Sequence, residues 1–234
     1  AGHLLQWDIK QAHRLRPMLA AIDDTDLRCQ LTRLLDRFDA EIAPRLPLLR
    51  AQSVHNDFNP HNLLVDASRA TRITGIIDFG DMVYSQRVNE LSIAMAYLMF
   101  NKEKPLEFGA AFVEGYQSVS RLEKREIEAL AILIPVRLGV SLSNSAIKHV
   151  EVLETAKAEN TSEQELKDKL HYITISERPA WKLLHQWISY NPVRITNLFL
   201  KSAGFEIPST DAFKKNIVHK RKKYFGKSLS LSYN

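Results

Sequence analysis

The chain has 234 residues, of which 45% are apolar and 25% charged, as in an ordinary globular protein with a sizeable core. Its net charge of +5 arises in residues 211–234, which carry seven Lys or Arg against one Asp, whereas residues 1–210 carry 25 basic and 26 acidic side chains. A nearly neutral body gives no support to nucleic-acid binding. The single cysteine, Cys29, excludes an intrachain disulfide and favours the reducing cytoplasm.

Neither the longest apolar run nor the first ten residues suggest a membrane protein. The longest apolar run, ALAILIPV at residues 129–136, is too short to cross a bilayer and is followed by Arg137, so it predicts a core helix. The first ten residues contain no initiator Met and no signal-peptide pattern. We therefore expect a cytoplasmic protein with no membrane partner, of which this chain is a piece.

The first predicted element is a helix over residues 25–42, capped by Asp24 or Thr25 and ended by Pro44. Six apolar residues fall on one face of it: Leu27, Leu31, Leu34, Leu35, Phe38 and Ile42. Short strands follow at residues 50–54, 62–65 and 72–78. After Asp81 the pattern is helical almost to the end, with helices over residues 88–100, 106–116, 125–150, 178–190 and 192–200. A further helix is expected to begin at Ser162, which forms a capping box with Glu165.

These elements predict an α+β fold that is mainly helical, with a small hairpin sheet that holds a polar loop. The loop lies within VHNDFNPHNLLVD, where Asp57 and Asn62 are five residues apart, and Asp78 ends the next strand in IDFG. Two carboxylates and an amide oxygen are hard ligands that suit Mg²⁺ completed by substrate phosphates and water. They make a poor zinc site, because His55 and His61 lack the helical spacing and no thiolate is near.

The order of these residues matches the layout of phosphoryl transfer. In that layout one loop Asp accepts the hydroxyl proton, an Asn five residues later holds metal, and a DFG Asp holds metal. Each piece alone is weak, but the ordered set in a strand–loop–strand context is specific. The competing interpretation is a polar hairpin turn with incidental carboxylates.

The stretch HNDFNPHNLLVD, followed by GIIDFGDMVYSQRVNELSIAMAY, resembles the aminoglycoside phosphotransferase and choline kinase family of small-molecule kinases. Within that family it is most similar to the hydroxylysine kinase type, and the resemblance runs from about residue 7 to residue 204. It implies the C-terminal lobe of a protein-kinase-like fold over residues 1–210. It also implies Mg²⁺ with ATP or GTP as donor, and a hydroxyl group of an amine-bearing metabolite as acceptor.

The resemblance also implies roles for individual residues. Asp57 would be the catalytic base, Asn62 and Asp78 the Mg²⁺ ligands, and Leu64 and Ile77 the floor under the nucleotide base. Four residues would support the site without taking part in the chemistry: His55, Phe79, Gly80 and Glu90. Asn59 and Asp81 lie beside the site without an assigned role.

The chain departs from the pattern of complete kinases at its N-terminal side. Its glycines form no G-x-G-x-x-G loop, and no strand with a candidate Lys precedes the catalytic loop. We therefore expect the N-terminal lobe to be missing from this chain, and the chain alone to be inactive. The competing class is a pseudokinase-like binding module without turnover.

The basic tail, residues 211–234, admits three interpretations: a solvated linker, a patch that binds nucleic acid or an acidic surface, or the opening of another domain. Its segment RKKYFGKSLSLSY resembles the start of class III aminotransferase domains of the phospho-lyase branch. If such a domain follows, the parent would be a kinase–aminotransferase fusion that also uses pyridoxal phosphate. We favour the linker to a following domain.

Overall fold

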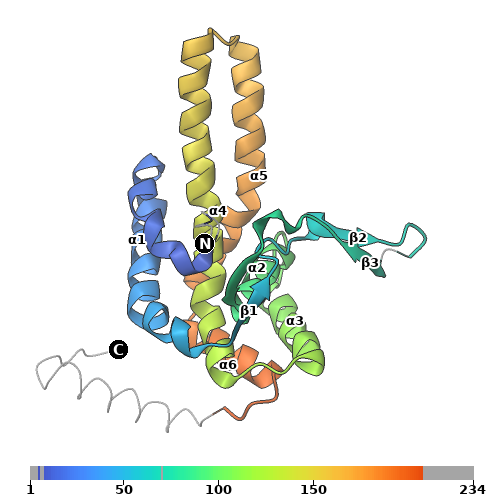
Figure 1. Ribbon diagram of the computed structural model, residues 1–234. Coiled ribbons are helices and arrows are strands. Elements are labelled where there is room, and N and C mark those ends of the chain that lie inside the picture. Colours follow the sequence, from blue (N-terminus) through green and yellow to red (C-terminus); the bar gives the residue numbers. More distant parts are fainter. Residues whose placement is uncertain (1–4, 6–7, 70, 208–234) are drawn as a thin grey trace, which may run out of the picture.

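The computed structural model describes residues 5, 8–69 and 71–207, with the side chains of residues 175 and 176 excepted. Its body is mainly helical, as predicted, and is built on the long helix α4 (Lys124–Glu159), which contacts α1, α2, α5 and α6 (Figure 1). The other helices are α1 (Thr25–Arg37), α2 (Arg87–Leu98), α3 (Pro105–Val119), α5 (Glu163–Ser189) and α6 (Pro192–Ser202). The predicted linker at residues 211–234 lies outside the described residues.

The first half of helix α4 forms the centre of the core because it is apolar on nearly every side. Nearly all side chains from Ile127 to Asn144 are buried, and Gly139 lets α1 approach closely, since a Cβ there would lie 3.0 Å from Leu31 Cδ2. Within the described residues α4 alone is long and apolar enough to cross a membrane, but 72% of its most apolar 18-residue window is buried inside the protein. Its composition therefore reflects packing in the core.

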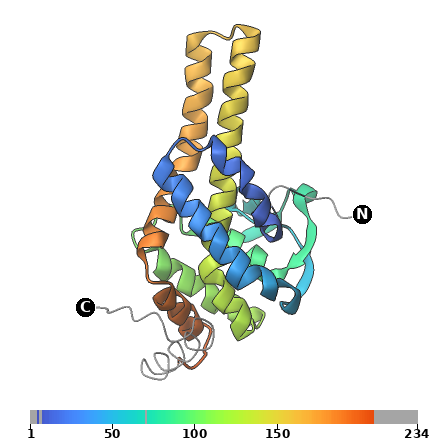
Figure 2. The same cartoon turned by 90° about the vertical axis from the view of Figure 1, so that its left-hand side faces the viewer.

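Helix α1 and the segments around it cover one side of α4. The Asp24 carboxylate accepts hydrogen bonds of 3.0 Å from the backbone N–H groups of Asp26 and Leu27, which confirms the predicted N-cap. All six residues of the predicted apolar face are buried, although the chain leaves α-helical geometry after Arg37 and continues as a π turn, η3 (Phe38–Ile42). Figure 2 shows α1 lying across α4 on this side. Short 3₁₀ segments flank it: η1 (Ile9–Leu15), η2 (Pro17–Ala21) and η4 (Ala43–Leu48).

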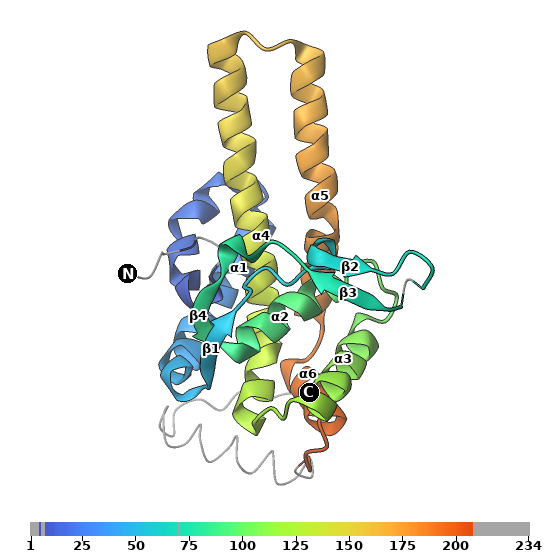
Figure 3. The same cartoon turned by 45° about the vertical axis from the view of Figure 1, so that its right-hand side comes forward.

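The strands form two small antiparallel ladders within the described residues, not the single hairpin sheet that the sequence predicted. The hairpin of β2 (Leu63–Val65) and β3 (Ile73–Ile76) is where it was expected and projects from the body (Figure 3). A second ladder pairs β1 (Ala51–Val54) with β4 (Val83–Gln86). The sequence analysis expected only helices after Asp81 and therefore missed strand β4. Strand β4 is short, and its partner precedes it by about thirty residues, so it has only a weak local signal.

A second correction concerns α5. The sequence predicted a separate helix beginning near Pro179, because proline favours the first turn. In the structure Pro179 lies inside α5, which runs unbroken from Glu163 to Ser189. A proline inside a helix costs about 3 kcal/mol, and here the packing of α5 along α4 offsets that cost. The predicted cap at Ser162 is present, since its hydroxyl accepts a hydrogen bond from Glu165 N.

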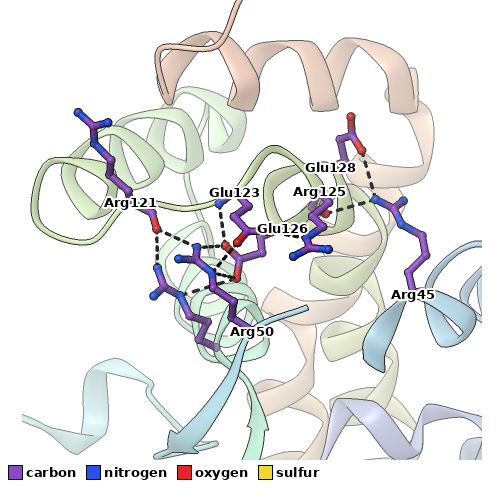
Figure 4. A network of polar contacts seen from close by, with 8 residues as sticks. Arg45, Arg50, Arg121, Glu123, Arg125, Glu126 and Glu128 are labelled. Carbon is purple, nitrogen blue, oxygen red and sulfur yellow. Dashed lines mark hydrogen bonds and ion pairs between the residues drawn. The ribbon is translucent and has the colours of Figure 1, made fainter. Parts of the chain in front are cut away.

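An arginine–glutamate cluster joins the start of β1 to the start of α4. Glu126 is fully buried, pairs with Arg50, and lies 3.8 Å from Arg87 Nε (Figure 4). The guanidinium groups of Arg50 and Arg87 also donate to the carbonyl oxygen of Arg121, at 2.8 and 2.7 Å. Because Arg50 directly precedes β1, this cluster, called the Glu126 clamp below, fixes the strand that leads into the polar loop.

Candidate active site

The polar loop, residues 55–62, connects β1 to β2 through the short 3₁₀ turn η5 (Pro60–Asn62). Asn56 takes a left-handed backbone conformation with φ of 66°, which Asn tolerates better than most residues. Its backbone N–H donates a 2.7 Å hydrogen bond to Glu90 Oε2 on α2. The structure thus places Glu90 under the loop, where it fixes the residue before Asp57.

Three side chains converge on the carboxylate of Asp57. Arg137 Nη2 donates to Oδ1 at 3.0 Å, and the amide groups of Asn59 and Asn62 donate to Oδ2 at 2.9 and 3.1 Å. The Asp57 side chain remains 26% exposed. It is therefore held in one orientation, with an open side from which a substrate could approach.

Asp78 is brought beside this loop by the residue that precedes it. The backbone N–H of Ile77 donates to Asn62 O at 3.0 Å, and its carbonyl oxygen lies 2.8 Å from His55 Nε2. Asp78 then takes a left-handed conformation with φ of 62° and leaves its carboxylate exposed. These two backbone contacts place Asp57, Asn62 and Asp78 around one part of the surface.

The residues after Asp78 form a short 3₁₀ turn, η6 (Phe79–Asp81). The Phe79 ring packs on the His55 ring with 5.0 Å between centroids. A Cβ at Gly80 would lie 3.5 Å from Asp78 Oδ1, which is an ordinary contact distance. Asn59 caps η5, since its Oδ1 accepts from His61 N at 2.8 Å, and Asp81 lies half-buried on η6.

The oxygen donors at this site fit Mg²⁺ better than a metal whose ligands all come from the protein. Because the Asn62 amide nitrogen faces Asp57, its Oδ1 is the side-chain atom left to bind a metal, and the exposed Asp78 carboxylate is a second oxygen donor. No three His, Cys, Asp or Glu side chains in residues 8–69 and 71–207 come close enough to hold an ion. Two oxygen donors leave room for the phosphates and waters that Mg²⁺ retains.

Apolar side chains next to this site are exposed. Leu64 crosses the ladder over Gly75, where a Cβ would come within 3.3 Å of Leu64 Cδ1. We call the set the open apolar face; its members have exposed fractions of 42% to 69% and are Leu64, Val65, Ile73, Ile76, Ile77, Phe79, Met82 and Tyr84. Exposed apolar side chains in this number, on the hairpin and the segments beside it, are typical of a binding site or an interface.

Sequence reasoning missed Arg137 and Tyr97. Arg137 lies in the middle of α4, is only 2% exposed, and contacts the Tyr97 hydroxyl at 3.1 Å as well as Asp57. A buried arginine needs a partner of opposite charge. The signal was present in the sequence, because Arg137 interrupts an otherwise apolar run. Its partner could not be identified, since Asp57 lies 80 residues earlier.

The negative charge of the buried Glu90 carboxylate is expected to lower the free energy of unfolding, whereas the hydrogen bond that it accepts from Asn56 N–H is expected to raise it. Burial raises the pKa of Glu90, although the Asn56 N–H and nearby positive charge oppose this rise. A carboxyl with a raised pKa binds protons more readily in the folded state, so stability falls as pH rises from its ordinary pKa through the raised one. Glu90→Gln keeps an acceptor for Asn56 and should be neutral or slightly stabilising at pH 7, as urea unfolding would measure.

The matched variant Glu90→Ala removes the acceptor and leaves a buried N–H without a partner, so it should lose about 1–3 kcal/mol. If Glu90→Gln lost as much free energy of unfolding as Glu90→Ala, the charge of Glu90 and not its acceptor oxygen would stabilise the loop, and the prediction would be wrong.

Comparisons with known proteins add independent information. The model of a family described as "Phosphotransferase enzyme family" matches residues 2–130, which include Asp57, Asn62, Asp78 and Glu90. A hydroxylysine kinase of Mus musculus is 27% identical over 203 residues, covering 84% of this chain and 50% of the relative. One of Danio rerio is 32% identical over 138 residues, covering 58% and 39%, and one of Bos taurus is 26% identical over 203 residues. The chain thus spans about half the length of the curated relatives it matches.

Proposed function

This chain belongs to the phosphotransferase enzyme family, and we propose that it is the catalytic C-terminal lobe of a small-molecule kinase. The reaction would transfer the γ-phosphoryl group of ATP or GTP to a hydroxyl group of an amine-bearing metabolite. One observation carries the proposal: three donors orient the Asp57 carboxylate, while Ile77 ties Asp78 to the same loop. A polar turn with incidental carboxylates has no reason for this convergence.

In the proposed reaction Asp57 accepts the proton of the acceptor hydroxyl. The hydroxyl oxygen forms a bond to the γ-phosphorus, the bond from that phosphorus to the β,γ-bridging oxygen breaks, and the nucleoside diphosphate leaves. Arg137, Asn59 and Asn62 hold Asp57 in position for this transfer. Asn62 Oδ1 and the Asp78 carboxylate would hold Mg²⁺, which supplies neutralisation of the phosphate charge.

The open apolar face supports a second part of the proposal. Leu64 and Ile77 would form the floor under the nucleotide base, and a second lobe would cover the rest of this face. Two observations support this: the side chains are apolar and exposed, and the chain has about half the length of its relatives. A second lobe on such a face would enclose the nucleotide between the two lobes.

The relatives suggest the class of acceptor. Those compared above carry the name hydroxylysine kinase, and we propose an acceptor of that type, a linear amino acid with a side-chain hydroxyl.

Two assays test the proposal. A longer form of the protein that carries the second lobe should consume nucleotide with hydroxylysine and not with lysine, which lacks only the hydroxyl group. The present chain alone should show no measurable turnover, because only one of the two proposed lobes would contact the nucleotide. Equal nucleotide consumption with lysine would show that the hydroxyl is not the acceptor, and full activity of the chain alone would contradict the assignment of two lobes.

A further inference from the structure

Helix α4 contains a proline, Pro135, two residues before Arg137. In an α-helix the N–H group of residue 135 would donate to the carbonyl oxygen of Ala131, but proline has no N–H group and its ring crowds that carbonyl. Ala131 and Pro135 are both buried, so the carbonyl oxygen has little access to solvent. A buried carbonyl in this position needs a donor from another part of the chain.

Trp187, near the end of α5, provides this donor. Its indole Nε1–H donates to Ala131 O at 3.1 Å, and the side chain is buried. Packing alone would leave the indole ring some room to move, because a cavity of about 140 Å³ lies beside it, lined in part by Ala131, Pro135 and Trp187 itself. The hydrogen bond therefore fixes how α5 meets this turn of α4.

The same turn of α4 carries Arg137 on its other side. Successive residues of an α-helix are rotated by about 100°, so Arg137 points about 200° away from Pro135. The cavity beside Pro135 is accordingly lined by residues of α1, α5 and α6, whereas Arg137 contacts Asp57 at 3.0 Å and the Tyr97 hydroxyl at 3.1 Å. This turn thus lies between the Trp187 hydrogen bond and the ion pair that holds Asp57.

The ion pair between Arg137 and Asp57 tolerates little displacement. Its distance of 3.0 Å would have to grow by only about 0.6 Å for the hydrogen bond to be lost. Helices bend most readily at a proline, where the ladder of backbone hydrogen bonds is interrupted. Loss of the Trp187 donor is therefore expected to shift the turn that carries Arg137, and with it the orientation of Asp57.

We propose that Trp187 is a positioning residue for the catalytic base. Its hydrogen bond to Ala131 O replaces the one that Pro135 removes, and it holds the turn from which Arg137 orients Asp57. This inference rests on the proposed function, since it takes Asp57 to be the group that accepts the proton. It connects the end of α5 to the reaction through one turn of α4.

A double-mutant cycle in the present chain tests the hydrogen bond. Trp187→Phe keeps an aromatic ring and removes the N–H group, whereas Pro135→Ala restores a helical donor to Ala131 O. The rise that Trp187→Phe causes in the equilibrium constant of unfolding should be at least fivefold larger with Pro135 present than in the Pro135→Ala background, because only the former leaves a buried carbonyl without a donor. Equal rises in the two backgrounds would overturn the inference.

The effect on the site is measured at the Arg137 guanidinium by NMR. Exchange of its N–H protons with solvent should be at least tenfold faster in Trp187→Phe, and within threefold of wild type in Pro135→Ala/Trp187→Phe. Trp181→Phe is the matched control, because Trp181 lies on the same helix but is 39% exposed, and it should exchange as wild type does. Unchanged exchange in Trp187→Phe would overturn the positioning role. If Trp187→Phe alone does not fold, the double variant must fold and exchange as wild type, and its failure would overturn the inference.

In a form of the protein that carries both lobes, Trp187→Phe should lower kcat at least tenfold, with KM for nucleotide and acceptor within threefold. Pro135→Ala/Trp187→Phe should recover kcat to within threefold of wild type. A kcat that Trp187→Phe leaves unchanged would overturn the positioning role. A two-lobed protein that transfers phosphate to no alcohol would instead overturn the proposed function, while the exchange at Arg137 would still report on Trp187.

Discussion

Replacing Asp57 with Asn is expected to lower the rate of phosphoryl transfer by roughly a hundred- to ten-thousand-fold in a form of the protein that carries both lobes. This is the range for removing a positioned general base. The Asn side chain has the shape of Asp and offers one oxygen to Arg137, so the loop should keep its fold. It cannot accept the proton of the acceptor hydroxyl. Steady-state kinetics and circular dichroism of the same sample separate the two effects.

The matched control is Asp36→Asn, because Asp36 is an exposed carboxylate on α1 that pairs with Arg16 at the protein surface. It should keep activity within about twofold of wild type, since surface ion pairs contribute little. An Asp57→Asn enzyme with more than a tenth of wild-type activity would show that another group accepts the proton.

Glu126→Gln is expected to reduce the free energy of unfolding by about 3 kcal/mol. The Glu126 carboxylate is fully buried, and its loss would leave Arg50 and Arg87 without their buried counter-charge. We expect the lower end of the known range because Arg50 is 38% exposed and can turn toward water. Urea denaturation followed by circular dichroism measures the loss.

Glu128→Gln is the control for the Glu126 clamp, two residues further along α4. Glu128 pairs with Arg45 at 3.2 Å, but its side chain is 35% exposed, so its loss should cost less than about 1 kcal/mol. Equal effects of the two substitutions would mean that burial does not set the strength of the clamp. Because the clamp holds the start of β1, Glu126→Gln should also loosen the polar loop.

Much of the helical body could be predicted because its signals are local. The apolar face of α1 and its Asp24 cap are features of one short segment, and the structure confirms both. Strand β4 and the continuity of α5 through Pro179 could not be predicted. Both depend on a partner element elsewhere in the chain: β1 for the strand and α4 for the helix.

The candidate site likewise contains residues that the sequence could identify and residues that it could not. Asp57, Asn62 and Asp78 could be identified because one loop and one strand end carry them with a characteristic spacing; their roles stay predictions. Arg137 comes from α4, 80 residues after Asp57 in the chain. Only the packing of α4 against the loop brings the two together, so no local pattern could have assigned Arg137 to the site.

We propose that residues 55–80 form half of a phosphoryl-transfer site, and the product made by a form of the protein that carries a second lobe tests this most sharply. Phosphorus NMR should follow the γ-phosphoryl group of the nucleotide to the acceptor. We expect one phosphate ester on the acceptor hydroxyl for each nucleotide consumed. Release of inorganic phosphate alone, or ester formation on a group other than a hydroxyl, would contradict it.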